Sequence, residues 1–265
     1  MDRYRLKNVI IMILLLVNAF LAGSVAMRGR SERTSFQRTA EELAALFAAD
    51  GMALEDGAIS RTTPPASLSL SRDTAQEERA AAQLLGESAT AVDQGGGLYR
   101  YASGSGEALF RSSGGFEASG VLAEPEEAAS YCRAFCRAFS FAEPELGTEG
   151  AFQTVRLYEG LPVFNCTVTF TLTSGRVVAV SGTLLPAGGT PVESQQPPLS
   201  AAGALTAFQQ MRRESAAVAS SVTGTQLCYE LVSSGASMTL TPAWRVVTDT
   251  TDYYVNCITG AVTAG

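Results

Sequence analysis

The chain of 265 residues contains no histidine, and its single lysine, Lys7, lies near the start. Histidine and lysine are the side chains that most often act as general bases, activate nucleophiles or form Schiff bases. Histidine is also a principal zinc ligand. Their absence from the rest of the chain excludes Ser-His-Asp, Cys-His and Ser-Lys catalysis there, together with His-ligated metals. We therefore expect a protein that is not an enzyme, with no catalytic residue, no metal site and no cofactor.

Cysteine is scarce as well, and the count of five is odd. Cys132 and Cys136 lie in a helical pattern at a spacing that puts them on one face. Without histidine or a CxxC pair they do not make a metal site, and free cysteine is among the most buried residue types. Buried thiols are the expectation. A disulfide between Cys228 and Cys257, which both fall in predicted strands, is the alternative.

Positive charge is also sparse. The 19 basic and 26 acidic residues of the whole chain fall to 16 and 25 once Arg3, Arg5, Lys7 and Asp2 are set aside. An acidic surface of this kind argues against nucleic acid as a partner. It suits a folded domain in an extracytoplasmic space.

What the chain does have is an uncharged apolar run at 8–27. A helix of about 20 residues spans roughly 30 Å, the thickness of a bilayer core. We predict a transmembrane helix at 8–27 after a cytoplasmic start at 1–7, in contact with membrane lipid. The alternative is a cleaved signal peptide that ends at Ser24-Val25-Ala26. The length of the run and the arginine at position 28 favour retention of the helix.

The basic residues at positions 3, 5 and 7 favour a cytoplasmic N-terminus, so the long C-terminal part is expected outside the cell membrane. Small residues in the predicted helix permit close approach of a second membrane helix, and a mid-span asparagine prefers a partner to lipid. The candidate partner-contact residues are Asn18, Ala19, Ala22, Gly23 and Ala26. The alternative interpretation is that these are ordinary small residues of a membrane anchor.

The remainder of the chain has the pattern of an α+β protein. A membrane-proximal α+β region is predicted at 28–122. Its expected elements are a helix at 31–50, a strand at 52–59, a helix from the N-cap Asp73 to Leu85, and a hairpin of strands at 98–102 and 107–111.

Two later segments, 123–186 and 199–265, each read as a helix followed by antiparallel strands, with a linker at 187–198. The first has a predicted helix from Pro125 to Phe141 and strands at 152–158, 163–172 and 176–184. The second has a predicted helix at 201–215 and strands at 226–232, 238–247 and 253–258. Because the linker is short, we expect the two units to pack as one rigid body.

Carboxylate pairs offer the remaining route to an enzyme, because glycosidases use two carboxylates across one bond. Asp249 and Asp252 instead resemble a solvated hairpin turn. Glu124, Glu126 and Glu127 resemble charges at a helix start. Strand aromatics are candidates to stack on sugars or peptides, although core packing is their commoner role; they are Tyr99, Tyr101, Trp244, Tyr253 and Tyr254.

The order of these elements resembles the YycI family and the related YycH proteins, with their tandem PepSY-like units. The resemblance is carried by the start Met1-Asp2-Arg3 directly before a single anchor, by the hairpin sequence Tyr158-Glu159-Gly160-Leu161-Pro162-Val163-Phe164, and by a strand–turn–strand ending. That ending reads Pro242-Ala243-Trp244-Arg245-Val246 and then Tyr253-Tyr254-Val255-Asn256-Cys257-Ile258-Thr259-Gly260. Residues 60–122 match least distinctly, and the high Ala, Gly and Arg content departs from the usual composition of the family.

The resemblance implies a non-catalytic, membrane-anchored extracytoplasmic regulator of a sensor histidine kinase in a two-component system of the cell-wall homeostasis type. It implies contact with that kinase through the anchor and the outer domain, and a second, related regulator is a further candidate partner. The alternative function is an extracytoplasmic binding or inhibitory module for a protease or a cell-wall ligand.

Overall fold

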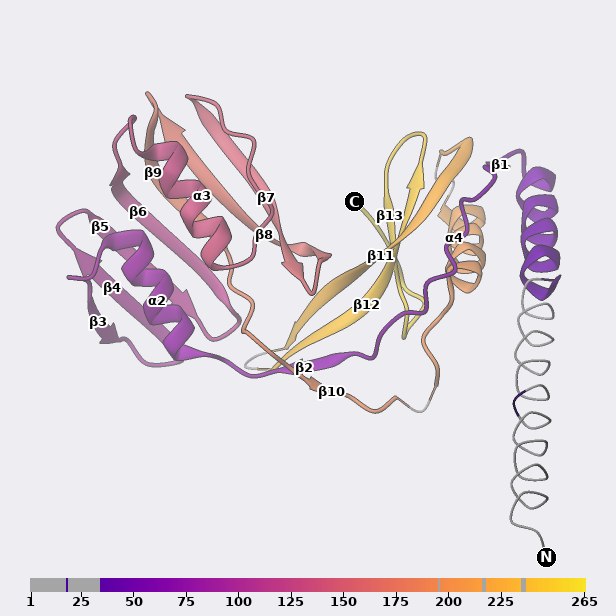
Figure 1. Ribbon diagram of the computed structural model, residues 1–265, viewed down its shortest axis with the longest axis horizontal. Helices are drawn as coiled ribbons and strands as arrows, with labels where there is room; N and C mark the ends of the chain where they lie inside the picture. The colour runs from indigo at the N-terminus through magenta and orange to yellow at the C-terminus, as the bar shows by residue number, and fades with distance from the viewer. Residues whose placement is uncertain (1–17, 19–33, 195, 216–217, 235–236) are drawn as a thin grey trace, which may run out of the picture.

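The computed structural model describes residue 18 and residues 34–194, 196–215, 218–234 and 237–265. Its elements form two lobes with strands running between them (Figure 1). The described strands belong to one connected, mixed sheet of 14 strands. The predicted α+β class is therefore confirmed for the described residues. The predicted transmembrane helix lies outside them except for Asn18, and no described helix is long and apolar enough to cross a membrane.

The first lobe is an antiparallel sheet with two helices on one face (Figure 1). Its strands pair in the order β7-β8-β9-β6-β5-β4-β3. Phe110, Phe116, Phe135 and Phe170 pack between the helices and the sheet. The elements are α2 (Thr74–Leu85), β3 (Thr90–Asp93), β4 (Leu98–Ser103), β5 (Gly106–Arg111), β6 (Gly115–Ala123), α3 (Ala128–Ala138), β7 (Gly150–Tyr158), β8 (Leu161–Thr173) and β9 (Arg176–Thr183).

The second lobe combines the C-terminal part of the chain with the helical segment 34–49. Trp244, fully buried, and Phe208 lie at its core, and Trp244 Nε1 donates to Leu199 O at 2.9 Å. The strand β1 pairs in parallel with β11, so the chain after segment 34–49 adds an edge to the C-terminal hairpin. The elements are β1 (Ala53–Leu54), α4 (Ala201–Ser215), β11 (Ser221–Ser234), β12 (Ser237–Thr248), β13 (Tyr253–Asn256) and β14 (Val262–Ala264).

Two short strands and a third core join the lobes. β2 (Leu68–Leu70) pairs with β12, and β10 (Thr190–Pro191) pairs with β2. β8 meets β11 in parallel at Val163 and Tyr229. The core at this junction also contains Leu70, Leu185 and Leu240. The prediction that the two units pack as one rigid body stays a prediction.

Helices with clear local signals were predicted well. α4 spans the predicted residues 201–215, and α2 ends at Leu85 as expected. Asp73 caps α2 by accepting from Gln76 N–H at 3.0 Å. The side chain of Gln76 does not complete the capping box, because its Nε2 donates instead to Leu185 O at 3.0 Å.

Other boundaries were wrong. α3 begins at Ala128 rather than Pro125 and ends at Ala138 rather than Phe141. The helix stops because Ser140 takes the left-handed conformation, at φ 52, and Phe141 N–H then bonds Cys136 O at 2.8 Å. The strand expected at 52–59 is reduced to Ala53–Leu54.

The sequence analysis also missed β6, whose glycines weaken the strand pattern. Gly120 is required there because a Cβ atom at this position would lie 2.1 Å from Ser105 O. β6 therefore passes close to the turn between β4 and β5, and it joins residues 98–111 to β9 in one sheet.

Candidate functional site: a groove beside helix 34–49

The C-terminal end of helix 34–49 is docked firmly on α4. Leu43 and Phe47 are buried, and the Phe47 and Phe208 rings stack with centroids 6.4 Å apart. Asp50, just beyond the helix, accepts from Arg213 Nε at 2.7 Å and from Gln209 Nε2. The hydrogen bond from Arg213 and the charges around it lower the pKa of Asp50. Apolar packing and an ion pair thus both hold this end of the helix to the second lobe.

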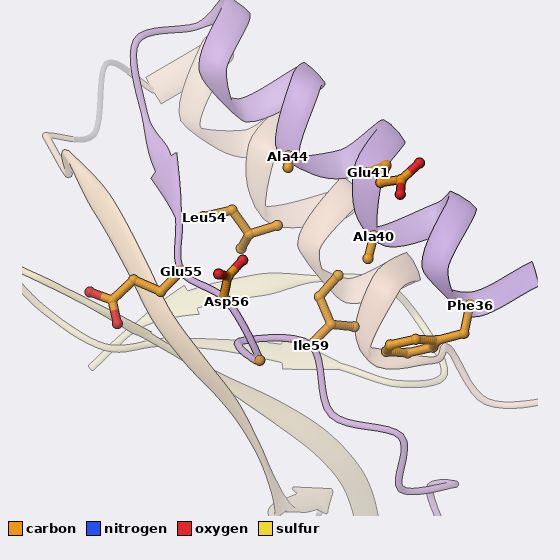
Figure 2. A pocket seen from close by; sticks show the side chains of 9 residues that line it. Phe36, Ala40, Glu41, Ala44, Leu54, Glu55, Asp56 and Ile59 are labelled. Atoms are coloured by element: carbon orange, nitrogen blue, oxygen red, sulfur yellow. The ribbon is translucent and has the colours of Figure 1, made fainter. Parts of the chain in front are cut away.

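The N-terminal half of the same helix forms one wall of a groove (Figure 2). Phe36 and Ala40 face Leu54 and Ile59 across a space of about 170 Å³. Three carboxylates, Glu41, Glu55 and Asp56, stand at its edge, and Ala44 and Gly57 complete the lining. The groove is therefore apolar within and acidic at its rim.

The groove continues past Phe36 into a wider hollow of about 690 Å³. There the guanidinium of Arg61 lies over the Phe36 ring, 4.3 Å from its centroid, a cation–π contact. The remaining wall comes from Pro64, Pro198 and Ala202, which bring the linker and α4 to the same place. An apolar groove of this form suits a peptide or helix from a partner. It offers no nucleophile with an activating base.

The predicted partner-contact residues are placed only in part. Asn18 is helical and exposed. Ala19, Ala22, Gly23 and Ala26 lie outside the described residues. The sequence analysis missed the groove itself, because its walls come from three separate segments; the apolar stripe that includes Phe36 and Ala40 was the available signal.

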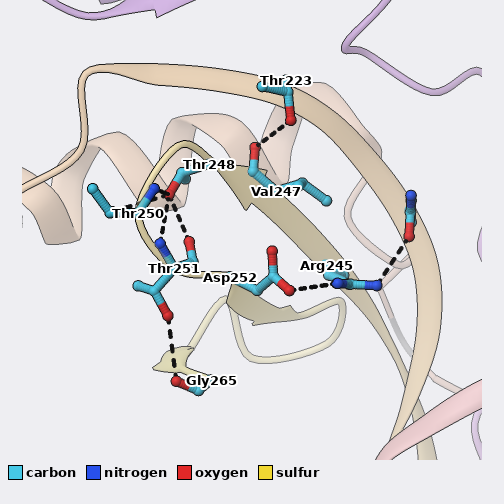
Figure 3. A network of polar contacts seen from close by, with 9 residues as sticks. Thr223, Arg245, Val247, Thr248, Thr250, Thr251, Asp252 and Gly265 are labelled. Atoms are coloured by element: carbon cyan, nitrogen blue, oxygen red, sulfur yellow. Dashed lines mark hydrogen bonds and ion pairs between the residues drawn. The ribbon is translucent and has the colours of Figure 1, made fainter.

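The hairpin at the end of β12 is a turn, as predicted. Thr248 Oγ1 donates to Thr251 O at 2.6 Å and accepts from Thr250 and Thr251 N–H (Figure 3). Asp252 accepts from Arg245 Nε at 2.8 Å and Nη2 at 2.5 Å. These bonds give the carboxylate of Asp252 a structural role in bracing the turn.

Asp249, on the same turn, is held by hydrogen bonds from the start of β11. The hydroxyl of Ser220 and the N–H groups of Ser221 and Ser220 donate to it and lower the pKa of Asp249 to about 2. A general acid at neutral pH needs a raised pKa, so Asp249 is unsuited to that role. Glu124, Glu126 and Glu127 are exposed, and Glu124 pairs with Arg176 at 2.8 Å.

All five cysteines are free and buried, so the alternative of a disulfide between Cys228 and Cys257 is wrong. Cys228 Sγ donates to Ala243 O at 3.3 Å, and Cys257 follows the end of β13 instead of lying within a strand. Burial raises the pKa of both thiols to about 12, which leaves little thiolate at neutral pH.

The five aromatic residues named as candidates to stack on sugars or peptides pack against other side chains of the protein. Tyr101, Trp244 and Tyr253 are buried. Tyr99 lies under the guanidinium of Arg72, with 5.0 Å from Cζ to the ring centroid. Tyr254 stacks on Phe164 at 3.8 Å between centroids, across the junction of the lobes.

Comparisons with known proteins give likeness of fold alone. No family model matches the chain, and no curated protein matches it. An uncharacterized protein from Eubacterium rectale is similar at 9% identity with a TM-score of 0.40, over 80% of this chain and 85% of that one. YycH from Bacillus subtilis is similar at 9% identity with a TM-score of 0.36, over 79% of this chain and 56% of YycH.

Proposed function

We propose that this chain is a non-catalytic, single-pass membrane protein whose C-terminal domain lies outside the cell and modulates a sensor histidine kinase. The observation that carries the proposal is the docking of helix 34–49 on α4. This helix follows the predicted anchor in the sequence, and Phe47 and Asp50 join it to the second lobe. Because helix 34–49 is packed against α4, a change in the second lobe would act on the segment that follows the predicted anchor in the sequence.

A ligand in the groove would act on the N-terminal half of helix 34–49. Leu43 and Phe47 are buried, whereas Phe36 and Ala40, one to three turns earlier, are only partly covered and line the hollow. An occupant of the groove would contact the half of the helix nearest the predicted membrane. Binding there would favour one position of the helix over others, and by thermodynamic linkage a partner of the anchor would alter affinity in the groove.

Two arguments favour a kinase as the partner: the sequence resemblance, and the candidate contact residues of the predicted membrane helix, which we call the anchor face. Asn18 and Gly23 belong to that face, which would meet a kinase membrane helix. A second, related regulator is proposed to share this contact. The acidic domain has no expected nucleic-acid partner.

The test is co-purification of the full-length protein from its native membranes, with partners identified by mass spectrometry. Four forms are compared: the natural chain, a chain with an unrelated anchor, the double variant Asn18→Leu with Gly23→Leu, and the control Val17→Leu on the opposite side of the predicted helix. We expect the kinase to co-purify with the natural chain and with the Val17→Leu control. The amount of kinase recovered should fall at least tenfold with the unrelated anchor and with the double variant.

Equal recovery of the kinase with the unrelated anchor would contradict a role for the anchor face. Recovery of a secreted protease or wall polymer by all four forms, with no kinase, would favour an extracytoplasmic binding or inhibitory module instead. A further variant, Phe47→Ala, keeps the anchor but loosens the helix from α4. It should retain the kinase and lose control over its phosphorylation.

A further inference from the structure

Arg156 is held inside the first lobe, with 6% of the residue exposed. β7 carries it between β8 and the segment after α3, since Arg156 pairs with Val163 on one side and with Phe141 on the other. Leu157 N–H donates to Ser140 O at 2.8 Å and fixes the backbone further. The position of the guanidinium is therefore set by strand pairing rather than by chance packing.

This guanidinium has no counter-charge among the described residues. Its Nε and Nη1 atoms are buried and donate no hydrogen bond. The Phe141 ring lies beneath it, with the centroid 5.8 Å from Cζ. Other arginines of the lobe, such as Arg72 and Arg176, pair with carboxylates. Buried polar groups are nearly always satisfied and buried charges nearly always paired, so the guanidinium of Arg156 is suited to an anionic partner.

Arg156 lines a groove of about 1060 Å³ between α2 and the end of α3. The two helices that form its sides lie next to each other on the sheet (Figure 1). Small side chains leave the space open; they are Ala75, Ala82, Ala138 and Ala187. The groove is thus large enough for several amino-acid residues, and the buried arginine is at its wall.

The other charges of the groove limit the anion. Glu78, Arg79 and Glu87 also line it, from α2 and the turn that follows. Arg79 has a carboxylate partner of its own, Asp73, at 3.9 Å. The two glutamates would repel a doubly charged phosphate, yet they would attract an ammonium group. A carboxylate with a single charge forms a charge-assisted hydrogen bond with a guanidinium N–H group. The combination fits a ligand with a carboxylate and an ammonium group.

We propose that this groove binds the carboxylate of an amino acid or of a short peptide, with Arg156 as the residue that pairs with it. The ammonium end of the ligand lies towards Glu78 and Glu87. The site is in the lobe that helix 34–49 does not touch. It is therefore independent of the kinase contact and can be tested without it.

The test measures binding to the full-length protein by calorimetry and by the rise in unfolding temperature. The probes are trialanine with a free C-terminus, trialanine amide, glycine, and inorganic phosphate. We expect trialanine to bind and its amide to bind at least tenfold more weakly. Glycine separates the two sources of carboxylate: binding as tight as that of trialanine assigns the site to free amino acids, and weaker binding assigns it to peptides.

Variants tie the signal to the residue. Arg156→Met should weaken binding at least tenfold. Arg156→Lys, which keeps the charge without the planar guanidinium, should have an affinity between that of the natural chain and that of Arg156→Met. Arg137→Met removes an exposed arginine of α3 outside the groove and should bind normally. If Arg156→Met does not fold, the proposal is tested by the affinity of Arg156→Lys for trialanine and by the difference between trialanine and its amide. Equal binding of trialanine and its amide, phosphate binding as tight as carboxylate binding, no binding of any probe, or unchanged binding in the Arg156 variants would overturn the proposal.

Discussion

Replacement of Asn165 by alanine should weaken the connection between the two lobes. Asn165 lies in the irregular part of β8 beside β11. Its side-chain amide makes the two hydrogen bonds that a neighbouring strand's backbone would make there. Its Oδ1 accepts from Leu231 N–H and its Nδ2 donates to Leu231 O, both at 2.8 Å. Backbone pairing between β8 and β11 is otherwise confined to Val163 and Tyr229. The side chain therefore supplies two of the few polar bonds across the junction.

The size of the effect follows from those two bonds. A net hydrogen bond contributes about 0.5–1.5 kcal/mol, and Leu231 is buried, with 8% exposed, so water replaces the lost partner poorly. We expect a loss of about 2 kcal/mol in the free energy of unfolding. For a domain of this size that corresponds to a fall of roughly 4–8 °C in Tm.

Differential scanning calorimetry of the full-length protein provides the assay. The natural chain should unfold in one transition, and Asn165→Ala should move that transition down without splitting it. Gln153→Ala is the matched control, because Gln153 on β7 makes a single, exposed side-chain bond to Thr167 on the neighbouring strand β8. It should shift Tm by about 1 °C. Two separate transitions in the natural chain, or equal shifts in both variants, would refute the reasoning.

Two further predictions concern the left-handed residue Ser140 and the dependence of stability on pH at Asp249. Ser140→Gly should raise stability by about 1 kcal/mol, seen as a higher Tm in circular dichroism, because Ser140 adopts φ 52 and glycine does so without strain. Asp249 has a folded pKa of about 2, below its ordinary 3.8, so its contribution is present above pH 3.8 and disappears as the pH falls through 2. Asp249→Asn should therefore lower stability at pH 5 and bring it close to that of the natural chain near pH 2 in denaturant titrations, and an unchanged difference would contradict this.

Local signals made much of the fold predictable. α2 is bounded by Asp73 and Gly86, and Ser200 caps the start of α4 by accepting from Gly203 N–H at 3.3 Å, so these boundaries were predicted correctly. β8 was found from the alternation of its side chains, which the structure shows as alternating buried and partly exposed residues. The end of α3 was not predicted correctly, because the left-handed conformation of Ser140 has no signature in the sequence.

Long-range pairing was the part that could not be predicted. β1 is a strand only because Ala53 meets Ser221 far along the chain, and two residues carry no periodicity. The groove beside helix 34–49 depends on the same pairing, because β1 places Leu54 opposite Ala44 and brings the following loop under Phe36. Arg156 stood in a strand that was predicted correctly, but its burial depends on the turn at Ser140.

The docking of helix 34–49 on α4 also sets the order in which the protein can be assembled during synthesis. Asp50 and its partner Gln209 are 159 residues apart. Residues 74–183 supply the sheet and helices of the first lobe, so that lobe can close while the ribosome is still at work. Leu43 and Phe47 must wait, uncovered, until α4 and the last strands emerge. The second lobe therefore begins first in synthesis and is completed last, and helix 34–49 keeps its apolar face uncovered throughout that interval.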